Sequence, residues 1–298
     1  MIGRIALAVL AILVAGVLAI YYLVEPPRVL SWADAAVGGG RGTQQVARGV
    51  AFGDHGQALD VWRPANDDPT TPRPVLIFYY GGGWAHGNRG AYAFAARAYA
   101  KAGFVVVVPD YRKVPGVRFP AFVQDAADVV KWTRDNIVGY GGDPTRIAVA
   151  GHSAGAYNAI MLTMDPRWLR AVGVDPTIIK AAVGLSGPYD FFPFDKPRSI
   201  EAFKGVENGP ATQPIHYARK GLAPMLLVTS TNDTQVRPYN AKNLTKALET
   251  AGSPVELIDY DGLSHEDVAM ALSKPFRGKA PVLNDSVAFL NRTLRSSR

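Results

Sequence analysis

Residues 146–164 read RIAVAGHSAGAYNAIMLTM, and this stretch decides the fold. Its start, Arg146–Ala150, is mostly apolar and predicts a short strand, while Ala154–Met164 predicts a helix. The turn GHSAG at 151–155 is so short that only glycine fits its flanking positions. We therefore expect Ser153 to be lifted off the edge of a sheet and to sit at a helix N-terminus, where free N–H groups favour negative charge.

Strands and helices alternate on both sides of this stretch. Short apolar runs rich in β-branched residues predict strands that are buried on both faces of a sheet. The predicted strands are Val46–Phe52, Gln57–Arg63, Pro74–Tyr80, Phe104–Pro109, Arg146–Ala150, Lys180–Leu185, Met225–Thr229 and Val255–Tyr260. The predicted helices are Tyr92–Ala102, Phe119–Ile137, Ala154–Met164, Arg237–Ala251 and Ser286–Leu294. This order predicts an α/β domain with a mainly parallel sheet, helices on both faces and an antiparallel pair at its start.

Two segments interrupt the alternation. Residues 188–221, with several prolines and glycines, predict a small cap or lid inserted between two strands, because loops of such length are usually functional. Residues 28–44 contain three consecutive glycines at 38–40 and predict a flexible linker. We therefore expect one folded domain over residues 45–298.

The chain begins with an apolar segment. Ile5–Val24 is a run of 20 uncharged residues preceded by Arg4. In a helix, a run of this length spans the roughly 30 Å hydrocarbon layer of a membrane. We expect residues 1–27 to be a transmembrane anchor that holds the domain outside the cytoplasm, or a signal peptide cleaved from a secreted protein. The anchor is preferred because the apolar run continues past Ala19, where signal peptidase could cleave.

Charge and cysteine content exclude several function classes. The net charge is +7, but Lys and Arg are scattered, and no basic stripe or nucleic-acid-binding module is present. A mild preference for an anionic lipid surface accounts for the charge better. The chain has no cysteine, which excludes disulfides, thiolate catalysis and cysteine-ligated zinc. We expect no nucleic-acid partner, metal or cofactor.

A serine hydroxyl is a poor nucleophile unless a base lies within hydrogen-bond reach, and the chain has five histidines. His55 falls in the first hairpin turn, His216 in the cap and His86 just past a glycine loop. His152 is inside the tight turn, where the local geometry points it away from the serine. His265 follows the last strand, and loops after strand ends are where open α/β sheets build their sites. We therefore predict that His265 is the base.

An acid should hold the imidazole in one tautomer and stabilise its positive charge. Asp233, after the strand Met225–Thr229, and Asp261, four residues before the histidine, are both candidates. Asp233 is preferred because it leaves an adjacent strand on the same rim as the serine. Asp110 precedes the serine in the chain, and we expect it to brace the loops with Tyr111 and Arg112.

An acyl-transfer intermediate also needs hydrogen-bond donors for its oxyanion. The N–H group of Ala154, directly after the serine, is one expected donor. The other comes from the loop after the strand Pro74–Tyr80, which continues as Gly81-Gly82-Gly83-Trp84. Consecutive glycines let bare backbone amides approach a substrate, and we favour Gly82 and Gly83.

These motifs together resemble the esterase/lipase branch of the α/β-hydrolases, which includes hormone-sensitive-lipase-like carboxylesterases and feruloyl-esterase-like enzymes. The matching segments are YYGGGW at 79–84, VVPDYR at 107–112, YGGDPTRIAVAGHSAGA at 140–156, SGPYD at 186–190, DTQVRP at 233–238 and the closing His265. Residues 140–156 also look like membrane-bound isoprenylcysteine methylesterases. Tyr80 stands where many members have histidine, and His152 replaces an acid found in the hormone-sensitive-lipase-like group, which leaves the subfamily open.

The resemblance implies an α/β-hydrolase fold and a serine carboxylesterase that hydrolyses small or medium acyl esters through an acyl-enzyme. Ser153, Asp233 and His265 would form its triad, with Gly82, Gly83 and Ala154 donating to the oxyanion. An amidase, formamidase or peptidase using the same triad is an alternative. A hydrolase fold that binds without catalysis is another. The sequence leaves the oligomeric state open.

Overall fold

A computed structural model describes residues 24–65 and 71–295 of the chain. The expected anchor or signal peptide, residues 1–27, lies almost entirely outside the described residues and stays a prediction. Among the helices of the two described ranges, none combines the length and the hydropathy that a membrane span requires.

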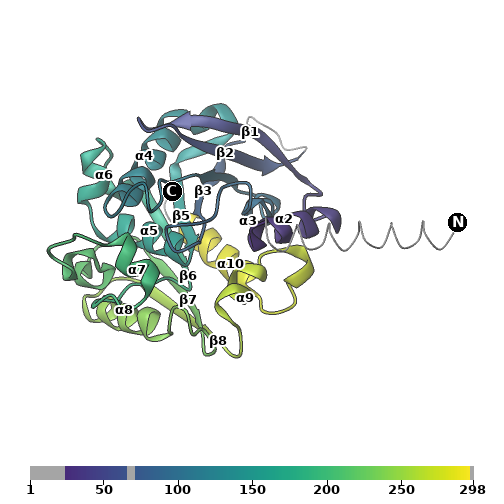
Figure 1. The fold of residues 1–298 in the computed structure, drawn as a ribbon. Coiled ribbons are helices and arrows are strands. Elements are labelled where there is room, and N and C mark those ends of the chain that lie inside the picture. The colour runs from purple at the N-terminus through teal and green to yellow at the C-terminus, as the bar shows by residue number, and fades with distance from the viewer. Residues whose placement is uncertain (1–23, 66–70, 296–298) are drawn as a thin grey trace, which may run out of the picture.

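The described residues form an eight-stranded sheet with the order β1-β2-β4-β3-β5-β6-β7-β8 (Figure 1). The strands are β1 (Thr43–Phe52), β2 (Gln57–Pro64), β3 (Arg73–Tyr79), β4 (Val105–Pro109), β5 (Gly142–His152), β6 (Ile179–Leu185), β7 (Met225–Ser230) and β8 (Val255–Tyr260). β2 pairs antiparallel with both β1 and β4, whereas all pairings from β4 through β3 to β8 are parallel. This confirms the predicted sheet and its antiparallel start.

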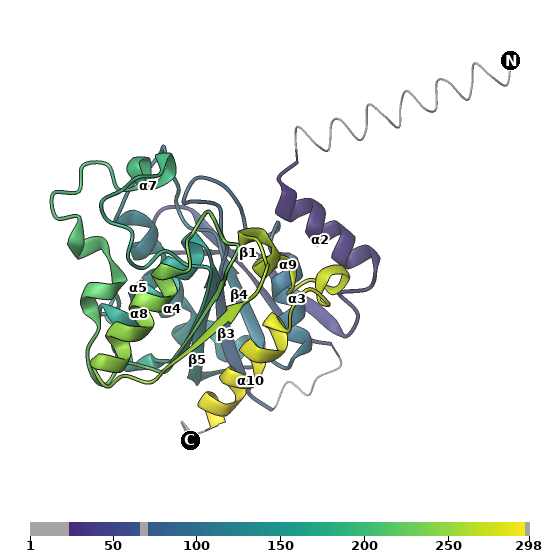
Figure 2. The same cartoon turned by 90° about the horizontal axis from the view of Figure 1, so that it is seen from below.

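Helices cover both faces of the sheet (Figure 2). On one face lie α3 (Ala93–Lys101) and α10 (Val282–Arg295), and on the other lie α4 (Ala121–Asn136), α5 (Ala154–Met164) and α8 (Tyr239–Thr250). Short helices in the connections are η1 (Ile137–Tyr140), α6 (Arg167–Ala171), η2 (Pro176–Ile178), α7 (Pro197–Ala202), η3 (Pro210–Thr212), η4 (Pro214–Tyr217), α9 (His265–Met270) and η5 (Lys274–Phe276). The central strands are therefore covered twice, and all five residues of β4 are buried.

The insertion expected at residues 188–221 lies between β6 and β7. It contains α7, η3 and η4, joined by irregular segments. Its aromatic side chains pack together: Phe191 and Phe194 both contact Phe203, with ring centroids 5.4 and 4.9 Å away. Phe203 in turn stacks on Phe119, which precedes α4. The insertion is thus fastened to the sheet domain by aromatic contacts.

The prediction of a flexible linker at residues 28–44 is wrong. Pro26–Ala36 forms helix α2, and β1 already begins at Thr43. α2 packs against α3 and η5, so the folded unit starts before the expected boundary at residue 45. The three glycines that predicted flexibility end the helix instead, with Gly38 at φ +80°.

A buried ion pair holds α2 in place. Asp34 Oδ2 accepts from Arg97 Nε at 2.8 Å and from Nη2 at 2.7 Å, and Asp34 Oδ1 accepts from the backbone of Lys274 at 2.8 Å. Ser31 donates to the carbonyl of Ala91 and accepts from the amide of Phe94. The side chains of Asp34 and Arg97 are only 2% and 8% exposed, so neither charge has water as a substitute partner.

Replacing Asp34 with alanine should therefore destabilise the fold strongly. The Asp34→Ala variant leaves the Arg97 charge buried without its partner, which costs about 3–5 kcal/mol. Denaturant-induced unfolding would measure the loss. Glu256→Ala is the matched control, because the pair of Glu256 with Arg292 is more than half exposed and should contribute less than about 1 kcal/mol. Equal losses in both variants would contradict the anchoring role of Asp34.

Candidate active site

The turn after β5 has the strained geometry that the GHSAG sequence predicts. Ser153 has φ 55° and ψ −123°, a backbone region that residues other than glycine rarely occupy. A Cβ atom on Gly151 would lie 2.3 Å from the backbone of Gly155, and one on Gly155 would lie 2.1 Å from the carbonyl oxygen of Tyr79. Only glycine fits at either position, so the strand–turn–helix elbow is confirmed.

Ser153 is the N-cap residue of α5, yet its hydroxyl does not cap the helix. Its backbone N–H donates to the carbonyl of Leu185 at 2.9 Å, which holds the residue in place. The side chain is partly exposed and lines a cavity that His265 also lines. Within residues 24–65 and 71–295, no hydrogen bond engages the Ser153 hydroxyl, and catalytic hydrogen bonds often tighten only once substrate is bound.

His265 and Asp233 are joined directly. His265 Nδ1 lies 2.8 Å from Asp233 Oδ2, and both side chains are buried. Because the carboxylate can only accept, Nδ1 carries the proton and Nε2 is left as an acceptor. Asp233 Oδ1 accepts from the amides of Gln235 and Val236 at 3.0 and 2.8 Å. Burial alone would raise the pKa of Asp233, but the His265 contact and the N–H group of Val236 outweigh it and lower that pKa.

The rival acid, Asp261, lies elsewhere. Its Oδ1 accepts from Thr231 Oγ1 at 2.8 Å, and its side chain is exposed. Ser230 Oγ donates to the carbonyl of Leu263 at 2.8 Å and accepts from its amide at 2.9 Å. Asp261 therefore helps to tie the loop after β8 to the loop after β7, and this tie carries His265 to Asp233.

His152, which the sequence excluded as the base, contacts both the ring and the backbone of His265. The two rings lie 4.8 Å apart between centroids, and His152 Nε2 lies 3.1 Å from the backbone carbonyl of His265. Since a carbonyl only accepts, Nε2 carries the proton, and Nδ1 accepts from the hydroxyl of Tyr92 at 3.2 Å. The Tyr92 hydroxyl also lies against the glycine loop, because a Cβ atom on Gly81 would be only 3.0 Å from it. Tyr92 and His152 thus connect the glycine loop to the His265 loop.

The other histidines lie away from these contacts. His55 is exposed in the turn between β1 and β2, and His216 lies in η4 of the insertion. His86 also lines the cavity, and its backbone carbonyl lies where a side chain at Gly82 would be, with a Cβ there only 2.4 Å away.

The glycine loop presents backbone amides to the cavity. Gly82 and Gly83 have φ values of 131° and 59°, which favour glycine. Both residues line the cavity with Ser153 and Ala154. In the part of the chain that the structure describes, the N–H groups of Gly82, Gly83 and Ala154 donate to no protein acceptor. They are available to an oxygen atom of a bound ligand.

The bracing expected of residues 110–112 is present. Asp110 accepts from the backbone amide of Arg89 at 2.8 Å and pairs with its guanidinium group. Tyr111 donates from its hydroxyl to the carbonyl of Tyr80 at 2.9 Å, and Arg112 forms an ion pair with buried Asp125. These contacts hold the loop that begins at Tyr80.

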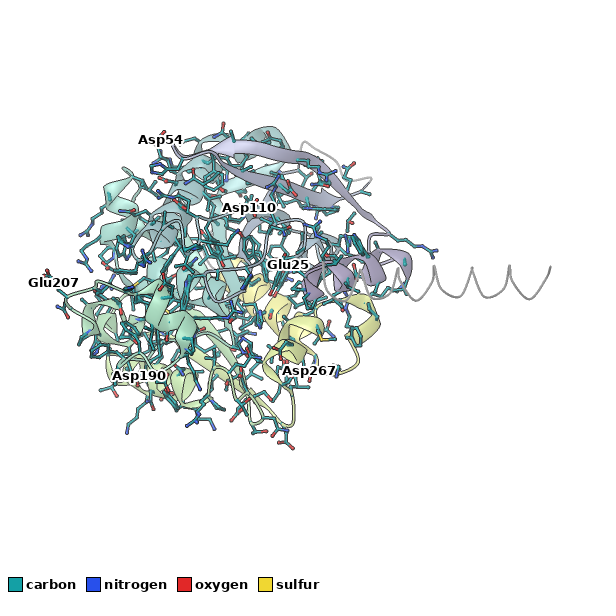
Figure 3. The ribbon with its side chains drawn as sticks, viewed as in Figure 1. Glu25, Asp54, Asp110, Asp190, Glu207 and Asp267 are labelled. Carbon is teal, nitrogen blue, oxygen red and sulfur yellow. The ribbon has the colours of Figure 1, made fainter. Side chains whose placement is uncertain are left out.

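The role of one residue at the cavity was not predicted from the sequence. Glu25 precedes α2 and lies at the end of that helix that faces the middle of the molecule (Figure 3). Its carboxylate accepts from the amide of Gly87 and from Asn88 Nδ2, both at 3.0 Å. The N-terminal segment thereby supports the glycine loop. A lone glutamate beside two prolines gave no signal of this role.

The cavity has a volume of about 1510 Å³ and is larger than a pocket for a typical small ligand. Its walls around Ser153 and His265 include the start of α2, the glycine loop, the insertion, the loop after β7 and the loop after β8. Within the described ranges, no group of three or more His, Asp or Glu side chains could hold a metal ion. The arrangement offers a hydroxyl, an imidazole and free amides around one space, and the buried Asp233 carboxylate contacts the imidazole.

The environment of His152 makes stability depend on pH. Burial, and then repulsion from a charge on His265, lowers the pKa of His152 from 6.5 to about 3. Below the ordinary value of 6.5 the unfolded chain binds a proton that the folded chain does not, so stability falls as the pH drops towards 3. Asp233 contributes to the pH dependence of stability at lower pH. Because its pKa is lowered in the folded chain, the stability it contributes is lost as the pH falls below its ordinary pKa of 3.8.

The His152→Gln variant should therefore lose less stability on acidification than the parent chain. The difference in slope should approach about 1.4 kcal/mol per pH unit in the window between the two pKa values. Denaturant unfolding at a series of pH values measures it, with His55→Gln as the control for loss of an exposed histidine. An unchanged slope in His152→Gln would show that this ring is not held neutral.

Comparisons with known proteins identify the family of the chain. Residues 59–248 match the BD-FAE family. Isoprenylcysteine alpha-carbonyl methylesterase ICME of Arabidopsis thaliana is 30% identical over 267 residues, which cover 82% of this chain and 62% of that protein. Esterase LipC of Mycobacterium tuberculosis is 32% identical over 240 residues, which cover 73% and 59%. The chain thus spans about three fifths of the length of these relatives.

Solved structures with the same fold are also esterases by name. The apo form of esterase 2 from Thermogutta terrifontis superposes with a TM-score of 0.69 at 25% identity, covering 85% of this chain and 95% of that one. The parallel sheet, the flanking helices and the elbow after β5 are those of an α/β-hydrolase. The chain belongs to the BD-FAE family, and its fold is the α/β-hydrolase fold.

Proposed function

We propose that the protein is a serine carboxylesterase that hydrolyses small or medium acyl esters through an acyl-enzyme. The observation that carries the proposal is the 2.8 Å contact of His265 with buried Asp233, beside the cavity that Ser153 and the free glycine amides line. A serine at a strained elbow, with an oriented imidazole at the same cavity, is the arrangement that acyl transfer requires.

The names of similar proteins support the ester-hydrolase class. The curated relatives include a methylesterase and an esterase. Esterase 2 of Thermogutta terrifontis has been solved with propionate bound and after phosphorylation by paraoxon. Organophosphates react with activated nucleophiles, and a bound short acid fits a product of ester hydrolysis. Both observations belong to that enzyme and favour the same chemistry here.

In the proposed first step, the Ser153 oxygen attacks the ester carbonyl while His265 Nε2 takes its proton. Asp233 stabilises the imidazolium that forms. The carbonyl oxygen becomes an oxyanion, and the N–H groups of Gly82, Gly83 and Ala154 donate to it. The imidazolium then protonates the leaving alcohol, and the acyl group stays on the serine.

In the second step, water replaces the alcohol. His265 takes a proton from the water molecule as it attacks the acyl-enzyme, and the same three amides hold the second oxyanion. Collapse of that intermediate returns the proton to Ser153 and releases the acid. Atoms and charge balance without a metal or cofactor, since one water molecule is consumed for each ester cleaved.

We also propose how the chain is placed and covered. Residues 5–24 would anchor the protein in a membrane with the hydrolase domain outside the cytoplasm, or the protein would be secreted if the leader is cleaved. The insertion at 188–221 would act as a lid, because Pro188, Phe191 and residues 195–199 line the cavity.

Replacing the nucleophile should abolish turnover. The Ser153→Ala variant loses the attacking oxygen, and its kcat should fall by about 10⁴-fold or more. Hydrolysis of p-nitrophenyl butyrate measures this, and a fluorophosphonate probe should label the parent chain but not the variant. Full activity in Ser153→Ala would refute the proposal. A parent chain that resists the probe would favour a hydrolase fold that binds without catalysis.

The two candidate acids should differ sharply. Asp233→Asn keeps the size of the side chain but disturbs the tautomer of His265, so kcat should fall by about 10⁴-fold. Asp261→Asn is the matched control and should stay close to the parent rate, since Asp261 contacts Thr231 instead. The same p-nitrophenyl assay serves for both. Equal losses of kcat in the two variants would contradict the assignment of Asp233 as the catalytic acid.

The leaving group separates the esterase from the alternative on the same triad. Turnover of p-nitrophenyl acetate and of formanilide, measured on one preparation, compares an alcohol with an amine as leaving group. A carboxylesterase should show the higher kcat/KM with the ester. A clear preference for the anilide would favour an amidase or formamidase.

A further inference from the structure

Helix α2 buries polar residues and exposes apolar ones, the reverse of what is usual for a surface helix in water. Of its residues, only Ser31 and Asp34 are buried, and both are polar. Every exposed residue from 26 to 37 is apolar: Pro26, Val29, Trp32, Ala33, Ala35, Ala36 and Val37. A surface helix of a globular protein ordinarily turns its apolar stripe inward and its polar residues outward.

The inverted orientation is fixed by hydrogen bonds. On one side of α2, Asp34 accepts hydrogen bonds from Arg97 and from the amide of Lys274. On the same side, Ser31 accepts from the amide of Phe94 at the start of α3. Glu25 holds the glycine loop at the start of the helix, and Lys274 Nζ donates to the carbonyl of Val37 at its end. With its polar side bound along its whole length, the helix can only present its apolar side outward.

The outward side borders the mouth of the cavity. Val29 and Ala33 line the cavity, while Trp32 and Val37 are 51% and 47% exposed. Across the mouth, residues 195–199 also line it, and the next residue, Ile200 of α7, is 50% exposed. α2, α9 and α7 lie along one side of the molecule, the upper side in Figure 2.

We propose that the outward face of α2, formed by Val29, Trp32, Ala33, Ala36 and Val37, docks on the surface of a lipid bilayer. α2 then lies in the interfacial layer with its apolar residues among the lipid chains. The mouth of the cavity opens at the bilayer, so that apolar esters enter it from the lipid phase.

A bilayer is favoured as the occupant for two reasons. In the sequence, the 20 uncharged residues Ile5–Val24 lead directly into Glu25 and α2, so whatever apolar phase receives that run lies beside this helix. Trp32 is the most exposed large apolar residue of α2, and tryptophan is enriched at the boundary between lipid and water. The surface goes beyond the proposed function and does not require that Ser153 be catalytic.

The absence of cysteine from the chain allows a direct test. Trp32→Cys and Val138→Cys, each labelled with the fluorophore nitrobenzoxadiazole, are reconstituted as full chains in phosphatidylcholine vesicles. Val138 is the matched control: it is an apolar residue, 67% exposed, in η1 ahead of β5, whereas the cavity lies past the other end of that strand. Circular dichroism checks that both labelled chains are folded.

The label at 32 should emit at shorter wavelength than the label at 138. Nitroxide groups on lipid chains should quench it at least about twice as strongly, while aqueous iodide quenches it less. A label at 32 that behaves as the label at 138 would overturn the proposal. So would a label at 32 that is shielded from iodide but not quenched by lipid nitroxides, which indicates a protein partner or a second copy. Because neither readout involves turnover, failure here is distinct from failure of the esterase proposal.

Discussion

Gly155, at the start of α5, lies so close to the carbonyl of Tyr79 that a single added carbon would come within 2.1 Å of it. This contact presses α5 against the end of β3, and the chain can reach it from β5 only through a turn in which Ser153 adopts a positive φ. The strain at the serine is thus maintained by packing of the surrounding sheet and helix. Everything else in the site is arranged around the position that this turn gives to the serine.

Two sets of contacts bring the remaining groups to that position. The loops after β7 and β8 are tied to each other through Ser230 and Thr231, which delivers His265 to Asp233. His152, inside the elbow itself, bonds to the backbone carbonyl of His265 on one side and to Tyr92 on the other. The serine turn, the histidine loop and the glycine loop are therefore one connected unit, in which His152 acts as a positioning residue that never needs to carry charge.

The N-terminal helix joins this unit from outside the sheet. Glu25 supports the glycine loop, and the buried pair of Asp34 with Arg97 fixes the helix on α3. The cost of burying that pair is offset only while both charges are present. The same pair determines which side of α2 faces outward, so one polar contact couples the shape of the cavity mouth to the apolar surface beside it.

The sequence by itself determined the sheet, its order of elements and the elbow, because these depend on local patterns: β-branched runs, helical periodicity and glycine at positions that no other residue fits. It also selected Ser153, His265 and Asp233 as candidates, from their places after predicted strands. Only the tertiary structure shows that Asp233, and not Asp261, contacts His265, because both follow adjacent strands and the contact depends on how two loops are tied together. It also turned a predicted linker into α2, since the polar groups that stabilise that helix, Arg97 and Lys274, lie 63 and 240 residues further along the chain. Contacts over such separations leave no local pattern, and they appear only when the chain is folded.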